Sequence, residues 1–365
     1  MNVLSLNIRG MAESSKYDWL KRLLKDYKFS FCGLQETRLT QLPNNIGNWW
    51  GIANLSVDFV ESVGKSEGII IFWDRGIFQD ITIIKNRHFL AVVGHWYGIA
   101  GETIFLNVYA PQAPAEKKTL WQTISNLMNS RPGTWIIFGD FNAVRRADER
   151  LNSHFCPRVA TTFNSFINNA GLLDLNMGGR KYTYFCEVGC KFSKLDRFLV
   201  CPNFMTAFPT ASVTAFSREH SDHSPILLRT AYLDFGPTPF RFFKSWLYWN
   251  DFDKIVRQTL EEFREEGTAD KVLSGKLRAV KNAIRNWRRT DFEMENAALA
   301  DLKIKVDNIE IQAETRQLSE TELKNRRDYK QQIQVLGLKL WFRLSVYSRW
   351  RVYSHIVYSH MYSAH

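Results

Sequence analysis

Asp140 and Asn142 lie two positions apart, directly after the apolar residues 136–138 and a glycine. Residues two apart in an extended chain point to the same side, so this carboxylate and this amide would face one site at the end of a buried strand. Strand ends of this kind are where open α/β sheets bind their ligands. Taken alone, the pair is explained equally well by a hydrogen-bonded Asp-Asn turn.

Polar side chains also stand at or just past the ends of other apolar segments that we interpret as strands. A core strand needs no polar residue at its end, and unrelated loops would not supply the same mixture each time. Carboxylate oxygens hold Mg²⁺, which stabilises charge on phosphoryl oxygens while another group deprotonates water. The mixture is therefore suited to hydrolysis of a phosphate ester. Its members are Asn7, Glu36, Tyr109, Asp140 with Asn142, Asp196, and Asp222 with His223.

The elements that must position these residues alternate between strand and helix patterns up to about residue 230. Helices are predicted over about 15–27, 115–129 and 160–170. Ser15 with Asp18 indicates a capping box for the first helix, and Gly171 a C-terminal cap for the third. Strands are predicted at 3–8, 29–34, 68–73, 81–84, 89–97, 103–109, 136–138, 182–185, 195–200 and 225–230. The series between 68 and 109 favours antiparallel pairing. Together these patterns predict an α/β (α+β) fold, a four-layered two-sheet β-sandwich flanked by helices.

The pattern changes after Phe235-Gly-Pro-Thr-Pro239, the clearest linker in the chain. Ser319 with Glu322 indicates a capping box late in this region, so a C-terminal antiparallel helical hairpin is the simplest arrangement. The hairpin could close on itself or pair with a second copy, which makes self-association through these helices possible. Helical, heptad-like spacing relates Leu273, Leu277, Val280, Ile284, Trp287, Leu299, Leu302, Val306, Ile309 and Ala313. We expect a domain at 1–232, a linker at 233–245, a coiled-coil-like helical region at 246–345 and a disordered tail at 346–365.

Composition narrows the class of protein. The formal net charge of +11 suits a polyanionic partner, nucleic acid above all. No apolar run approaches the roughly 20 residues of a membrane span, and the start lacks the features of a signal peptide. The odd count of five cysteines then favours reduced thiols in the nucleus or cytoplasm. Cys186 and Cys190 make a weak zinc candidate because no second ligand pair with suitable spacing lies near them.

Six short motifs occur in an order that resembles a known family, the endonuclease/exonuclease/phosphatase superfamily. Within it, the chain is similar to the apurinic-type endonuclease domain of plant LINE-type non-LTR retrotransposons. The motifs are Leu6-Asn-Ile-Arg-Gly10, Leu34-Gln-Glu-Thr-Arg38, Asn107-Val-Tyr-Ala-Pro111, Gly139-Asp-Phe-Asn142, Lys194-Leu-Asp-Arg197 and Ser221-Asp-His223. They cover residues 1 to about 230. No reverse transcriptase follows in this sequence, which we interpret as a truncated copy or a changed reading frame.

The resemblance implies a Mg²⁺ site, with Mn²⁺ as a possible substitute. Glu36 would be the principal ligand of the ion, assisted by Asn7, and Asp222 would be a second carboxylate near it. Asp140 would orient or deprotonate the attacking water. Asn142 would hold the phosphate or the water.

The resemblance also implies contacts with the nucleic acid. His223 would contact the scissile phosphate, Asp196 would fix the tautomer of this imidazole, and Tyr109 would donate its hydroxyl to a phosphate oxygen. Basic and polar residues near the motifs could bind the DNA backbone: Arg9, Arg38, Thr183, Lys181, Lys191 and Lys194.

The function predicted from the sequence is a Mg²⁺-dependent endonuclease that nicks DNA and leaves 3′-hydroxyl and 5′-phosphate ends. Two alternatives stay open. One is a deadenylase-like RNA hydrolase of the same superfamily. The other is a catalytically silent, nucleic-acid-binding retrotransposon remnant, which the basic balance and the heptad-like helices permit.

Overall fold

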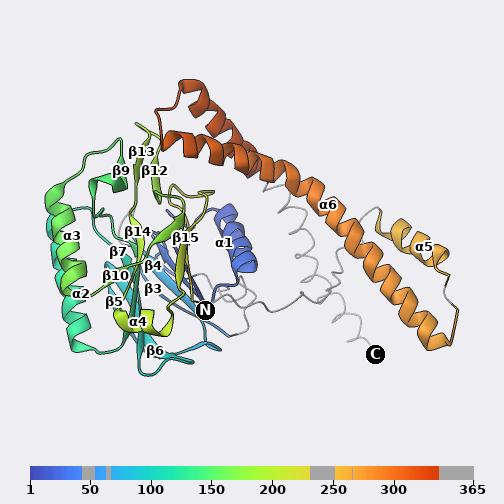
Figure 1. Cartoon of the computed structure of the whole chain (residues 1–365), viewed down its shortest axis with the longest axis horizontal. Helices are drawn as coiled ribbons and strands as arrows, with labels where there is room; N and C mark the ends of the chain where they lie inside the picture. Colours follow the sequence, from blue (N-terminus) through green and yellow to red (C-terminus); the bar gives the residue numbers. More distant parts are fainter. Residues whose placement is uncertain (43–53, 63–66, 231–250, 265, 337–365) are drawn as a thin grey trace, which may run out of the picture. The chain divides into compact units, whose positions relative to one another are not determined.

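The computed structural model describes residues 1–42, 54–62, 67–230, 251–264 and 266–336, without the side chains of 288–296. The chain forms two compact units (Figure 1). One comprises Met1–Tyr232 with Ile311–Leu318, and the other Leu233–Glu310 with Ser319–His365. The predicted linker at 233–245 and tail at 346–365 lie outside the described residues.

The first unit contains a seven-stranded sheet with the order β11-β15-β16-β1-β2-β4-β3. β1 pairs in parallel with β2 and antiparallel with β16, so the first and last strands of the unit are neighbours. The strands are β1 (Asn2–Asn7), β2 (Phe31–Gln35), β3 (Leu55–Val60), β4 (Ile69–Asp74), β11 (Met177–Gly179), β15 (Ser212–Ala215) and β16 (Ile226–Arg229).

A six-stranded sheet with the order β10-β14-β8-β7-β6-β5 is the second large layer. Its one parallel pair is β7 with β8, and the other neighbours are antiparallel. The strands are β5 (Phe78–Asn86), β6 (Phe89–Trp96), β7 (Thr103–Tyr109), β8 (Thr134–Asp140), β10 (Leu173–Asp174) and β14 (Asp196–Val200). A small third sheet joins β12 (Tyr184–Cys186), β13 (Lys191–Ser193) and β9 (Arg150–Leu151).

Alternating side chains hold the layers together, because successive residues of a strand face opposite sides. In β4, Ile71 and Trp73 belong to the core shared with the six-stranded sheet, whereas Ile70 and Phe72 belong to a second core with α1. Trp121 of α2 packs on Phe163 of α3. The helices are α1 (Ser14–Tyr27), α2 (Pro114–Ser130), the short 3₁₀ helix η2 (Ala147–Glu149), α3 (Pro157–Asn169) and α4 (Pro202–Ala207). The predicted arrangement of two sheets flanked by helices is confirmed.

Three local predictions have different outcomes. The antiparallel pairing of the series from 68 to 109 is confirmed, although the strands divide between the sheets: β4 pairs antiparallel with β2 and β3, while β5, β6 and β7 form an antiparallel run. α1 begins at Ser14 after Glu13 and has no side-chain cap, so the capping box of Ser15 and Asp18 was wrong. The cap at Gly171 is confirmed, because its φ of +62° is the left-handed conformation that ends a helix.

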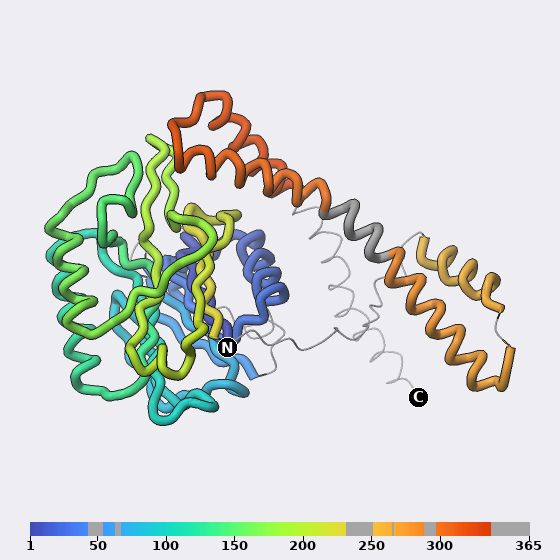
Figure 2. Tube along the Cα trace, in the orientation of Figure 1, coloured from blue at the N-terminus to red at the C-terminus, as the bar shows by residue number. Residues whose placement is uncertain are grey.

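The second unit is helical (Figure 2). Its helices are α5 (Phe252–Glu262), α6 (Ala269–Ala313), whose residues 311–313 are counted with the first unit, and a helix over residues 320–336. The predicted capping box is present, since Ser319 N–H donates to Glu322 Oε2 (2.8 Å) and Glu322 N–H donates to Ser319 Oγ (3.3 Å). Arg326 and Glu310 form a buried ion pair between the two arms of the predicted hairpin (2.8 Å). None of the described helices is both long and apolar enough to span a membrane.

Candidate active site

Strand register places three of the predicted site residues in one row across the six-stranded sheet. Tyr109 of β7 lies opposite Asp140 of β8, which lies opposite Asp196 of β14. In the other sheet, Asn7 at the end of β1 lies opposite Gln35, the residue before Glu36. Asn7, Tyr109 and Asp140 line a cavity of about 580 Å³, to which Asp196 contributes no lining atom. The two sheets therefore contribute to one site from neighbouring edges.

Asp140 is 1% exposed, and both of its carboxylate oxygens accept hydrogen bonds. Asn7 Nδ2 donates to Oδ2 (2.9 Å), and the backbone N–H of Asn142 donates to Oδ1 (2.8 Å). Burial raises the pKa of Asp140 to about 6, although the charge of His223 acts in the opposite direction. The turn that one reading of the sequence proposed is thus present, and the carboxylate also faces the cavity.

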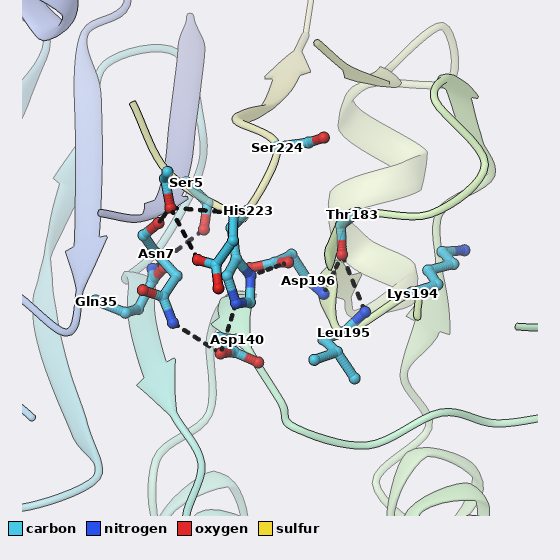
Figure 3. A network of polar contacts seen from close by, with 12 residues as sticks. Ser5, Asn7, Gln35, Asp140, Thr183, Lys194, Leu195, Asp196, His223 and Ser224 are labelled. Atoms are coloured by element: carbon cyan, nitrogen blue, oxygen red, sulfur yellow. Dashed lines mark hydrogen bonds and ion pairs between the residues drawn. The ribbon is translucent and has the colours of Figure 1, made fainter. Parts of the chain in front are cut away.

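His223 lies between two buried carboxylates (Figure 3). Its Nδ1 is 2.8 Å from Asp196 Oδ2, and its Nε2 is 3.9 Å from Asp140 Oδ2. Burial lowers the pKa of His223, but the charges of Asp196 and Asp140 outweigh it, so the net shift is upward. Thr183 Oγ1 accepts the backbone N–H groups of Leu195 and Asp196, both at 3.0 Å. The imidazole is therefore held in place and favoured in its charged form.

The backbone is left-handed at several residues of the site. Glu36, Arg9 and Asn142 have φ values of 52°, 52° and 47°, a conformation that costs non-glycine residues energy and gathers at functional sites. Gly139, with φ of +131°, has a different constraint: a Cβ there would lie 2.1 Å from the carbonyl oxygen of Val108. Only glycine allows β7 and β8 to approach so closely just before Asp140.

Carboxylate and amide oxygens at the cavity suit a hard divalent cation. Glu36, Asn7 and Asp222 all line it, and oxygen donors of this kind are the ligands that Mg²⁺ prefers. Arg38 pairs with Glu36 (2.6 Å) and Arg9 pairs with Asp222, so two guanidinium groups neutralise the carboxylates. The donor set fits a magnesium site. A cation that binds there would displace the two guanidinium groups from the carboxylates.

A second acidic group could also hold a metal: ligand atoms of Asp140, Asp196 and His223 lie within 4.8 Å of one another. A metal needs a neutral imidazole as its ligand, whereas the pKa of His223 is raised. Because Nδ1 of this histidine is already bonded to Asp196, we interpret the three residues as a hydrogen-bonded acid–base group.

Tyr109 and Asn142 are already engaged by protein groups. The Tyr109 hydroxyl donates to Glu36 Oε2 (3.3 Å), and burial is the main reason why its pKa is raised. Asn142 Nδ2 donates to the carbonyl of Ala110 (2.7 Å), while its Oδ1 accepts from Gln112 (2.7 Å). One N–H of the Asn142 amide is left for a phosphate or a water.

The residues predicted to bind the DNA backbone do not all reach the cavity. Arg9 and Lys191 line it. Thr183 is fully buried in the contact with Asp196 described above. Lys181 is exposed with its ammonium 5.1 Å from the Tyr182 ring, and burial lowers the pKa of Lys194. Arg38 reaches the site through Glu36.

Sequence reasoning missed several residues around the site. Gln112, Arg150 and Tyr184 line the cavity. Gln112 could have been found, since it directly follows the Tyr-Ala-Pro motif. Lys117 does not line the cavity but contacts the carbonyl of Asn142 (2.5 Å). Its position in the first turn of a helix reads as an ordinary solvated charge, so no sequence signal identifies it.

Comparison with known proteins identifies the family and the fold of the chain. The profile of the endonuclease/exonuclease/phosphatase family matches residues 2–252, and the chain belongs to that family. Its fold is similar to an AP endonuclease from Archaeoglobus fulgidus, with a TM-score of 0.51 and 15% identity over 64% of this chain and 100% of that one. Two other similar structures have lower TM-scores. They are a 3′ phosphatase from Neisseria bound to product DNA hairpin (0.48, 18% identity, 64% and 100% covered) and the endonuclease domain of TRAS1, a telomere-specific non-LTR retrotransposon (0.46, 16% identity, 62% and 96% covered).

Proposed function

We propose that this chain is a divalent-metal-dependent phosphodiester hydrolase that nicks DNA and leaves 3′-hydroxyl ends. The observation that carries the proposal is the buried Asp140–His223–Asp196 group at a cavity that the carboxylates Glu36 and Asp222 also line. Membership of the family supports a hydrolase acting on phosphate esters. The six motifs and their order support an origin in a LINE-type retrotransposon of plant type.

The protein groups divide the work by position. Asp140, fixed by Asn7 and the Asn142 N–H, orients the attacking water and accepts its proton. His223, kept charged by Asp196, donates to a phosphate oxygen, where charge develops during the reaction. Tyr109 turns its hydroxyl from Glu36 to another phosphate oxygen. Mg²⁺ or Mn²⁺, held by Glu36 with Asn7 and Asp222, would supply further positive charge at the phosphate.

Nicking of supercoiled plasmid tests the proposal directly. The full chain is incubated with plasmid and Mg²⁺, with EDTA added, and as the Asp140→Ala variant, with Asp26→Ala on the exposed side of α1 as the matched control. We expect wild type and the control to convert the plasmid to open circle, and EDTA or Asp140→Ala to abolish conversion. Extension of the nick by a DNA polymerase would establish the 3′-hydroxyl.

The same experiment separates the alternatives. A polyadenylate oligonucleotide is included beside the plasmid, and cutting of that RNA alone would replace the DNA endonuclease with a deadenylase-like hydrolase. Salt-sensitive DNA binding without cutting of either substrate would indicate a silent binding remnant, because phosphate contacts alone give affinity that falls with salt.

A further inference from the structure

Lys117 is a buried cation behind the catalytic turn. It lies in the first turn of α2 and is 6% exposed. Its ammonium donates to the backbone carbonyl of Asn142 at 2.5 Å, and among the described residues no carboxylate forms an ion pair with it. A buried charge is costly unless it is compensated, and the positive end of a helix macrodipole makes this position worse for a cation.

The surroundings of Lys117 explain what compensates this cost. Its largest favourable interaction with a charged group is with Asp140, while Arg150 acts against it. The carbonyl that it binds belongs to Asn142, whose left-handed backbone is itself strained. A neutral apolar residue at 117 would remove the cost of burying a charge but would leave the Asn142 carbonyl without this donor. Burial of the ammonium thus opposes folding, and the contact that compensates it is the one that holds the turn.

We propose that Lys117 is a positioning residue for the hydrolysis proposed above: its ammonium fixes the Asn142 carbonyl and so holds the Asp140–Asn142 turn in its working geometry. The inference rests on the proposed function, because the turn carries the group that acts on water. Lys117 does not line the cavity and touches no substrate. It acts from inside the protein, through the backbone.

The test compares Lys117→Met with Lys118→Met, a change at the exposed next position of the same helix. Three quantities are measured on the full chain: kcat and KM for plasmid nicking, the melting temperature, and hydrogen exchange of the Asn142 amide, which donates to Asp140. For Lys117→Met we expect kcat to fall about 10- to 100-fold, as when a preorganised contact is lost, while KM changes less than about threefold. The Asn142 amide should exchange about tenfold faster. The melting temperature should stay level or rise, and the control should match wild type.

Each other result has a defined meaning. If kcat falls only together with the melting temperature, Lys117 has a merely structural role and the proposal is overturned. Unchanged kcat with unchanged exchange also overturns it. If wild type itself cuts nothing, the proposed function fails, and the exchange of the Asn142 amide alone decides whether Lys117 holds the turn. If Lys117→Met does not fold, Lys117→Gln takes its place in the same measurements.

Discussion

His223 and Asp196 form a buried pair in which Nδ1 of the imidazole lies 2.8 Å from Oδ2 of the carboxylate. Asp196 is also the cross-strand neighbour of Asp140. One carboxylate thus orients the imidazole from behind, and the other stands beside its second nitrogen. This arrangement gives the two carboxylates different roles although both are buried within a few ångströms of the same ring.

Asp196→Asn should lower the pKa of His223, because the charge of Asp196 is the largest influence raising it. The imidazole would then be less often charged and its tautomer less fixed, and kcat should fall about 10²- to 10⁴-fold. NMR titration of the His223 ring with nicking kinetics measures both effects. Asp26→Asn is the control, and an unchanged histidine titration in Asp196→Asn would contradict the assignment.

Arg38→Ala should strengthen metal binding by the free protein. The guanidinium of Arg38 pairs with Glu36, the proposed principal ligand, and competes with any cation for that carboxylate. We expect the Kd for Mn²⁺, measured by calorimetry without DNA, to fall about 3- to 10-fold, the equivalent of roughly one kcal/mol of lost competition. Arg22→Ala, which removes an ion pair to Glu219, should not alter it. An unchanged Kd in Arg38→Ala would argue against Glu36 as a ligand.

Lys117 should make stability depend on pH in alkaline solution. Burial lowers the pKa of this ammonium from 10.5 to about 8, against the charge of Asp140 and with that of Arg150. Below about pH 8 the folded chain carries the disfavoured charge on Lys117. Between about pH 8 and 10.5 the unfolded chain binds more protons than the folded chain, so the free energy of unfolding of wild type rises with pH. Urea unfolding should therefore show that the free energy of unfolding of Lys117→Met exceeds that of wild type by more at pH 7 than at pH 10. An equal difference at both values would disprove the lowered pKa.

Arg197 should be among the most sensitive positions of the fold. Its fully buried guanidinium pairs with Glu149 and with Asp174 (2.8 Å) directly behind the active-site row. Arg197→Ala leaves Glu149 without its cation and leaves Asp174 with Arg145 alone, and it should cost about 3–5 kcal/mol of unfolding free energy. Arg146→Ala, which removes an exposed pair with Asp148, should cost under about 1 kcal/mol. Urea unfolding of both variants gives the comparison, and equal losses would contradict the importance of the buried network.

Much of the sheet architecture could be predicted because its strands are strongly apolar and end in polar residues. Asn7, Asp140 and Asp196 were found in this way: strand register places Asp140 beside Asp196, and Asn7 of the other sheet donates a hydrogen bond to Asp140. β3, the edge strand of its sheet, and β15, an inner strand, were missed because their sequences mix polar with apolar residues. Leu273 and Leu277 follow the apolar period of a helix but are exposed. An apolar repeat in the sequence identifies one face of a helix, but it does not show whether another element covers that face.

Side-chain partners could not be predicted from residue types. Arg9 and Arg38 are of the residue type that binds the DNA backbone, yet in the structure each pairs with a carboxylate of the site. Which partner a long cation reaches depends on left-handed turns at Arg9 and Glu36, and no local pattern fixes these. Lys117 was hidden for a similar reason, because its burial depends on how α2 packs.

The pairing of β1 with β16 has a consequence for the order of events when the chain is made. Asn7 comes from the first strand of the unit and His223 from the segment just before the last, and the Met1 amino group donates to Thr230 (2.7 Å). Contacts so distant in sequence form slowly and late in folding. On a ribosome, the residues of the site therefore cannot meet until nearly 230 residues have emerged. The hydrolysis proposed above would therefore have to wait until β16 has paired with β1.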